Sequence, residues 1–277
     1  MMRMHACQTA AGRLVIFAAA FLTSGLAAGL PVQPLLDDGY RQMYNLDFPA
    51  AHGAFAEYEQ ANPGDAMAPV SDAVAYLFTE FDRLNILRSE YWLNDKSFFV
   101  IGKPVGDPVL KKRFEDALAR GRQSAAATLK SSPDEASALL ANTMVLGLHA
   151  DYLALIDKKN LQALSEMKQS RNLADKLLAL HPDVYDAYIA PGIENYLLSL
   201  KPPPIRWILR LAGAETDREA GLRKMRMTAE KGHYFLPYAR LLLAIADLRD
   251  NNLVDAKEKL TWLAAEYPEN RIFRDEL

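Results

Sequence analysis

The residues best suited to hold a ligand follow the dipeptide Pro191-Gly192, which interrupts an otherwise helical stretch. Proline and glycine at this place should bend or break the helix and free backbone N–H and C=O groups. Glu194, Asn195 and Tyr196 come directly afterwards. Their polar side chains could line a ligand pocket, or they could simply satisfy the freed backbone groups. We therefore regard Glu194 and Asn195 as candidate binding residues.

Aromatic residues form a second candidate, beside the glycine- and proline-containing segment 94–108 (NDKSFFVIGKPVGDP). Tyr91, Trp92, Phe98 and Phe99 together exceed what one helical face usually buries, so an exposed patch is expected among them. The alternative is that these rings belong to the core, as aromatic residues at helical spacing usually do. We interpret residues 94–108 as an ordered insertion against the helices, because irregular segments of this length are uncommon and often functional.

Basic residues outnumber acidic ones between Lys201 and Lys231. Arg206, Trp207 and Arg210 follow three consecutive prolines in this region and could contact anionic lipid headgroups or an acidic partner. A solvated charged face is the alternative. The net charge of −3 gives no reason to expect a nucleic-acid partner.

Catalytic, nucleotide and metal-binding motifs are missing from the sequence: there is no HExxH, GxSxG, phosphate loop or calcium loop. Cys7 is the single cysteine, so thiolate metal sites and disulfides are not expected. We predict no catalytic residue, no metal and no cofactor, and a protein that is not an enzyme. His149, with Asp151 and Tyr152 in an apolar helix, is the histidine most suggestive of a site. A partly buried, hydrogen-bonded histidine is its expected role.

The first 27 residues have the pattern of a signal peptide. Arg3 and Arg13 precede the apolar run LVIFAAAFL, and Gly25 and Ala27 supply small residues at the −3 and −1 positions. We expect cleavage near Ala27 and export to a bacterial periplasm or cell envelope, with an uncleaved membrane anchor as the alternative. The mature domain is then residues 28–277. The last four residues, RDEL, resemble a retrieval signal of the endoplasmic reticulum, which we interpret as a coincidence of helix composition in a chain expected to be bacterial.

Helix-forming residues dominate the rest of the chain and predict an all-α fold. The stretch Pro237 to Pro268 predicts two antiparallel helices joined by a polar turn at residues 250–252. Its second helix carries Ala256, Leu260 and Leu263 at the same distances before Pro268 as Ala51, Phe55 and Tyr58 have before Pro63. Further helices are expected over 35–45, 50–60, 69–92, 109–130, 136–156, 161–180, 183–200, 205–211 and 215–231, with a last turn or two after 270.

With this proline-phased pairing, the chain resembles the tetratricopeptide repeat (TPR) superfamily, and most closely the uncharacterised exported repeat proteins of acidobacteria. The segments that carry the resemblance are Tyr44 to Asp65, Ser71 to Leu84, Gly147 to Leu155, Asp186 to Pro202 and Ala229 to Ala244. It implies a right-handed solenoid of α-α hairpins that binds proteins or peptides without catalysis. The chain departs from the family pattern in its 94–108 insertion, its Pro191-Gly192 dipeptide and its possession of only two clean repeats.

Two functions of different class follow from these patterns. The first is an exported scaffold that binds a protein or peptide partner and contacts the membrane surface peripherally. The second is a small-molecule or lipid carrier, with a pocket between the 94–108 insertion and the Pro191-Gly192 dipeptide. A carrier should enclose a mostly apolar cavity, whereas a scaffold should present an open groove with exposed aromatic or arginine anchors.

Overall fold

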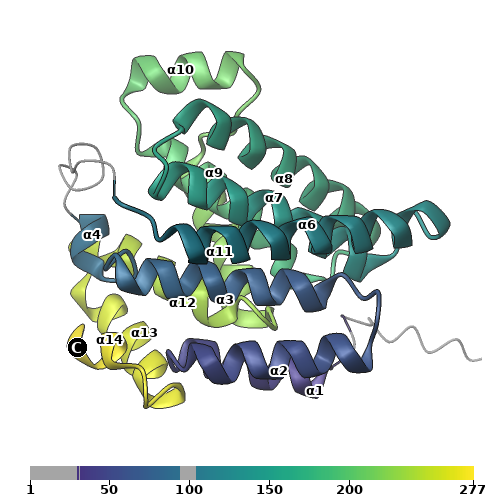
Figure 1. Cartoon of the computed structure of the whole chain (residues 1–277). Helices are drawn as coiled ribbons and strands as arrows, with labels where there is room; N and C mark the ends of the chain where they lie inside the picture. Colours follow the sequence, from purple (N-terminus) through teal and green to yellow (C-terminus); the bar gives the residue numbers. More distant parts are fainter. Residues whose placement is uncertain (1–29, 31, 94–103) are drawn as a thin grey trace, which may run out of the picture.

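The computed structural model describes residue 30, residues 32–93 and residues 104–277, and its regular elements are all helices (Figure 1). This confirms the all-α prediction. The predicted signal segment 1–27 lies outside the described residues, and so do residues 94–103 of the predicted 94–108 insertion, with Phe98 and Phe99. The elements are α1 (Pro34–Tyr44), α2 (Phe48–Ala61), α3 (Met67–Arg83), α4 (Ser89–Leu93), α6 (Pro108–Ser131), α7 (Ala136–Leu155), α8 (Asn160–Leu180), the 3₁₀ helix η1 (Tyr185–Tyr188), α9 (Ile189–Ser199), α10 (Pro203–Leu211), α11 (Arg218–Lys231), α12 (Leu236–Arg249), α13 (Leu253–Glu266) and α14 (Arg271–Asp275).

The hairpins α1–α2 and α12–α13 share one turn geometry, although they lie at opposite ends of the described chain. In each turn the residue two places before the second helix is left-handed, with φ of 66° at Leu46 and 58° at Asn251. In each, the next N–H donates to the carbonyl five residues earlier. The side chains predicted to point inward are all buried: Ala51, Phe55, Tyr58, Ala256, Leu260 and Leu263.

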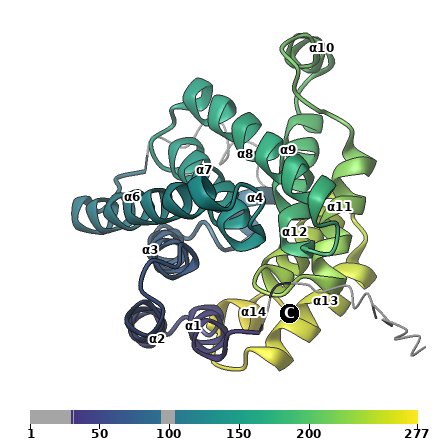
Figure 2. The same cartoon turned by 90° about the vertical axis from the view of Figure 1, so that its right-hand side faces the viewer.

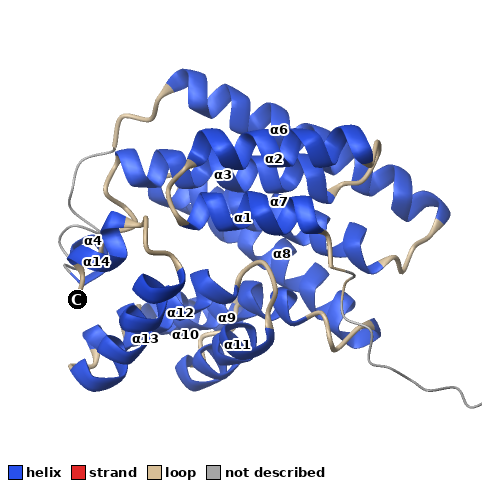
Figure 3. Ribbon diagram, turned by 90° about the horizontal axis from the view of Figure 1, so that it is seen from below, coloured by secondary structure: helices blue, strands red, loops and turns tan. Residues whose placement is uncertain are grey.

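Consecutive helices pack against one another along most of the chain, and together they form two layers. Helices α1, α2, α3, α6 and α7 lie on one side, and α9, α11, α12 and α13 lie on the other, with α8 packed against both α7 and α9 (Figures 2 and 3). The Tyr40 ring stacks on Tyr234 with centroids 4.7 Å apart, and the Tyr44 hydroxyl donates to the Tyr234 carbonyl at 2.9 Å. The first hairpin therefore touches a segment far along the chain, unlike an open superhelix in which repeats contact only their neighbours.

Helix α7 is the centre of the core. It packs against α3, α6 and α8 and buries residues on all sides, which its nearly uniform apolar sequence predicts. Among the described residues it is also the helix whose length and composition would suffice to cross a membrane. Two-thirds of its most apolar window, 67%, is buried within the fold, as expected for a central core helix.

The prediction of one helix over residues 69–92 is wrong. Helix α3 ends at Arg83, and Asn85 takes a left-handed conformation with φ of 58°. The Ile86 N–H then donates to the Phe81 carbonyl at 2.8 Å, which closes the turn before α4. Asparagine tolerates the left-handed region better than most residues, so the sequence carries a local reason for this turn. The turn redirects the chain so that α4 packs against α12.

The break predicted at Pro191-Gly192 is displaced to a point before Ile189, where η1 gives way to α9. Pro191 then lies in the first turn of α9, where its missing N–H costs no hydrogen bond. Gly192 allows α9 to pack closely against α11, because a Cβ there would lie 3.1 Å from the backbone nitrogen of Met225 on α11. Gly221 faces it on α11, and a Cβ there would lie 2.7 Å from the backbone nitrogen of Tyr196. The two glycines let α9 and α11 meet backbone to backbone.

Candidate functional site

Helix α10 projects from the body of the molecule, and none of its residues is buried (Figures 1 and 2). Its sequence alternates apolar residues with Arg206 and Arg210, which gives it one wide apolar arc and one narrow basic edge. Trp207 is 63% exposed and Leu211 is 70% exposed. The opposite border of the apolar arc, with Leu209, faces a cavity. The apolar arc of α10 therefore has an inner border, at Leu209, that faces the cavity, and an outer border, at Trp207 and Leu211, that faces solvent.

A cavity of about 330 Å³ lies beneath α10. Helices α7, α8, α9 and α12 and the end of α4 complete its walls. Its polar side chains are few, chiefly Lys201 and Arg249, and the Arg249 guanidinium donates to the Trp92 carbonyl. A largely apolar space of this size with a few polar groups is typical of a small-molecule site. The cavity is lined by Trp92, Ala154, Asn160, Leu161, Ala163, Leu164, Met167, Tyr196, Leu197, Leu198, Leu200, Lys201, Ile205, Leu209, Ile245 and Arg249.

Two smaller cavities adjoin this one through shared lining residues, with volumes of about 50 and 70 Å³. The first shares Trp92, Met167 and Tyr196 with the large cavity, and the second shares Met167 and Tyr238 with the first. Asp151 on α7 lines both small cavities. Burial raises the pKa of its carboxyl group to about 7. The three cavities lie between α7 and α8 on one side and α9 and α12 on the other.

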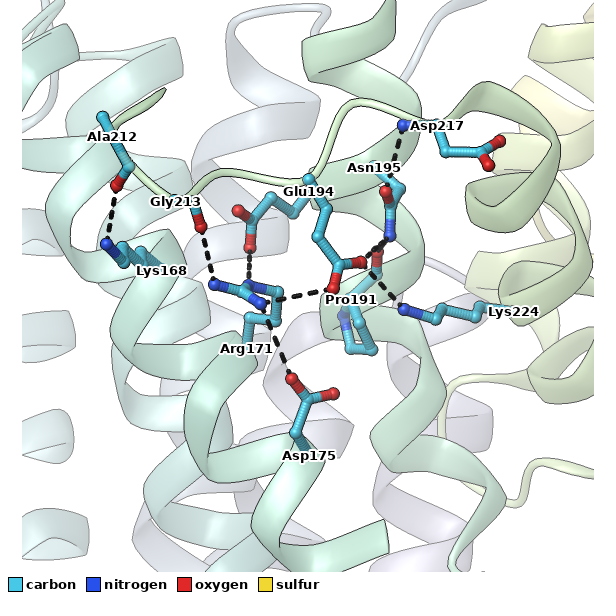
Figure 4. A network of polar contacts seen from close by, with 11 residues as sticks. Lys168, Arg171, Asp175, Pro191, Glu194, Asn195, Ala212, Gly213, Asp217 and Lys224 are labelled. Carbon is cyan, nitrogen blue, oxygen red and sulfur yellow. Dashed lines mark hydrogen bonds and ion pairs between the residues drawn. The ribbon is translucent and has the colours of Figure 1, made fainter. Parts of the chain in front are cut away.

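A polar network fixes the segment that returns from α10 to the body (Figure 4). Lys168 and Arg171 on α8 donate to the carbonyls of Ala212 and Gly213, at 2.7 and 3.1 Å. The Arg171 Nε also lies 2.9 Å from a carboxylate oxygen of Glu194, which is fully buried. Burial raises the pKa of Glu194, and the charge of Arg171 acts in the opposite direction. Arg171 thus joins the core of α9 to the end of α10.

Asn195 completes this network from the next position of α9. Its amide nitrogen donates to the Pro191 carbonyl at 3.0 Å and to Glu215 at 2.6 Å, and its oxygen accepts from the Asp217 N–H at 3.2 Å. Lys224 on α11 donates to Glu215 at 3.2 Å. Glu194 and Asn195 therefore hold the α10–α11 connection, and neither lines the cavity.

The remaining predicted binding residues divide between the cavity and the surface. Trp92 lines the cavity, and its indole N–H donates to the Ile86 carbonyl at 2.7 Å. Tyr91 is half-buried beside it, and its hydroxyl accepts from Lys158 at 3.3 Å. The three residues of α10 differ in what they meet. The Arg206 guanidinium donates to the Ser199 carbonyl at 3.2 Å, the Arg210 guanidinium donates to the Thr216 hydroxyl at 2.6 Å, and Trp207 points to solvent.

Sequence reasoning missed the contribution of α8, whose Leu161, Leu164 and Met167 form one wall of the cavity. It also missed Arg171 and the role of Asp151. On α7 the sequence pattern indicated His149 rather than Asp151. His149 lies 2.5 Å from a Glu166 oxygen on α8. A signal for the site was nevertheless present in the alternation of apolar and basic residues over 205–211.

Within the described ranges, no group of three or more His, Cys, Asp or Glu residues is placed to hold a metal ion. No protein-family model matches the chain, and no curated protein matches it either.

Proposed function

We propose that this protein is a non-catalytic carrier that binds one elongated apolar molecule, such as an acyl chain, in the cavity beneath α10. The observation that carries the proposal is the cavity itself, with a volume of about 330 Å³ and almost entirely aliphatic and aromatic walls. Burial of apolar surface would supply most of the binding free energy, at roughly 25 cal/mol per Å². Lys201 and Arg249 line this cavity and could meet a polar group of the ligand.

Helix α10 supplies a way for such a ligand to enter. It covers the cavity with Ile205 and Leu209, yet it buries no residue of its own against the body. An element with few buried contacts opens locally at low free-energy cost. The proposal keeps the expectation that residues 1–27 direct export, so that the carrier works in the cell envelope.

Native mass spectrometry and calorimetric titration with decanol would test the proposal. The wild-type protein, purified gently from its own cell envelope, should retain a bound mass of a few hundred daltons or bind decanol after delipidation. Ala154→Phe places a ring at the junction of two cavities and should abolish both signals. Leu253→Phe, at an exposed position on α13, should change neither. A wild-type protein that carries no small mass and takes up no decanol would refute the carrier.

The scaffold is a second candidate, and one observation favours it. The outer border of α10 presents Trp207, Ile208 and Leu211, which are 63%, 59% and 70% exposed. Aromatic and aliphatic anchors on one helical face are the form in which a helix docks into a partner's groove. The same mass spectra separate the candidates, because a scaffold should release a polypeptide, and Trp207→Ser should remove that polypeptide. Arg206 and Arg210 beside this face would suit an anionic membrane surface, which anionic vesicles would reveal by co-sedimentation.

We propose, in addition, that the fold is a divergent TPR-like array. The support is the pair of hairpins at the two ends, with equal turns and equivalent buried positions before Pro63 and Pro268. The contact of α1 with the residues before α12 distinguishes the array from a regular right-handed superhelix. A repeat solved in a related protein with the same left-handed turn residue would test this kinship.

A further inference from the structure

We propose that Asp151 is the anchor for a protonated amine on the ligand, so that the carrier takes up elongated apolar amines. The inference rests on the proposed function, because it assigns a polar group to the inner end of the same chain of cavities. The tail of the amine would occupy the large cavity beneath α10, and its nitrogen would reach the small cavities that Asp151 lines.

The first observation is that Asp151 is partly buried and lines both small cavities without a partner. No hydrogen bond or ion pair joins its side chain to any residue in the described part of the chain. Two other inward carboxylates there have partners: Glu194 forms an ion pair with Arg171, and Asp186 accepts from the backbone N–H groups of His233 and Phe235. A partly buried carboxylate without a partner is costly in a folded protein. Its presence beside an empty space indicates a site for a complementary group.

The second observation is that the surroundings leave the Asp151 charge uncompensated. Met167, Ile193 and Tyr238 line both small cavities from α8, α9 and α12, and Ile245 of α12 lines the one of about 50 Å³. Burial raises the pKa of Tyr238 well above its usual value, so this ring stays neutral. An ammonium group placed here would form a charge-assisted hydrogen bond with the Asp151 carboxylate. This bond would offset the desolvation of both charged groups.

The titratable groups around Asp151 set the expected pH dependence. From α7 itself, His149 is paired with Glu166 of α8. From α9, Tyr196 has its pKa raised by burial. Asp186, which precedes α9, lines the cavity of about 70 Å³ and is held by backbone N–H groups at the start of α12. The cations Lys201 and Arg249 lie on the large cavity. Since only the ionised carboxylate attracts an ammonium group strongly, the affinity for an amine should fall as the pH drops through the pKa of Asp151, about 7.

Calorimetric titrations with decylamine, decanol and decanoic acid test the inference. These probes share one tail and differ in the head group. The wild type should prefer decylamine near pH 8, and Asp151→Asn should weaken decylamine roughly tenfold to a hundredfold while changing decanol less than about twofold. The preference of the wild type for decylamine should shrink below pH 7, whereas the variant should lack this pH dependence. A circular dichroism spectrum of Asp151→Asn serves as the control for folding.

Each other outcome has a distinct meaning. Equal affinity for decylamine and decanol, or an Asp151→Asn protein that binds decylamine as well as the wild type, would overturn the amine anchor and leave the carrier standing. Tightest binding of decanoic acid would also overturn it and would assign the head group to Lys201 and Arg249. Binding of none of the three probes would refute the carrier, and the amine anchor with it.

Discussion

Asp151→Asn should change how the stability of the protein depends on pH, even when no ligand is bound. The carboxyl group is partly buried and has no partner, and this desolvation raises its pKa from the ordinary value of 3.8 to about 7. Asparagine has nearly the same shape but cannot ionise. The substitution therefore removes the charge and little else. The difference in the free energy of unfolding between the two proteins then measures how much that charge destabilises the fold.

The sign and the magnitude follow from proton linkage. Between the two pKa values the folded wild type holds a proton that the unfolded chain has released, so its free energy of unfolding falls as the pH rises. The slope is at most about 1.4 kcal/mol per pH unit. Between about pH 5 and pH 7 the wild type should therefore lose up to about 3 kcal/mol relative to Asp151→Asn, and little more above pH 8.

Urea unfolding, followed by circular dichroism at several pH values, would measure this difference. Asp157→Asn is the matched control, six residues along the chain. Burial tends to raise the pKa of Asp157, but its ion pairs with Lys111 at 2.8 Å and Lys159 at 3.4 Å lower it overall. Its ionised form stabilises the fold, so the control should lose stability relative to the wild type above pH 4 and regain parity in acid. Parallel pH profiles for wild type and Asp151→Asn would refute the argument that Asp151 is desolvated and unpaired.

Three further expectations concern stability and can be measured by urea unfolding. Arg171→Met should lower the free energy of unfolding by about 3 to 5 kcal/mol, because it leaves Glu194 buried and unpaired, and adding Glu194→Leu should recover most of the loss. Gly221→Ala should cost about 1 to 3 kcal/mol, because its Cβ would meet backbone atoms of α9, whereas Gly53→Ala has open space and should gain up to about 1 kcal/mol. Trp207→Ser should stay within about 0.5 kcal/mol of the wild type, and a larger loss would show that α10 packs on the body.

Local patterns were sufficient to predict most of the helices, because each hairpin carries its own turn and proline signals. The inward positions before Pro63 and Pro268 are buried as predicted. The errors arose where two patterns competed. The apolar period runs on through residues 84–88, but the left-handed Asn85 ends the helix there. Pro191 was interpreted as a break, although a proline in the first turn of a helix is well tolerated.

The site was less predictable, because its walls come from helices that are distant in the sequence. Trp92 was predicted because several aromatic residues lie close to it in the sequence. Its neighbours on α8 and α12, however, look like ordinary core residues in the sequence. Glu194 and Asn195 were identified as polar residues near a break, and their partners explain them instead. No local pattern distinguishes Glu194, which faces an arginine, from Asp151, which faces a cavity. That distinction depends on tertiary contacts alone.

The order of α10 comes from charge and backbone geometry rather than from packing. Gly213, with φ of 81°, lets the Gly213 and Ala214 N–H groups bond back to Arg210 and Leu209, which closes the helix end. Lys168 and Arg171 then bind the carbonyls at that end, where a cation is electrostatically favourable. These contacts hold α10 at its C-terminal end. The apolar side chains on both borders of its arc are not buried against the body. A helix fixed in this way can cover a cavity and still move from it without disturbing the core, which is what a ligand-binding role beneath α10 requires.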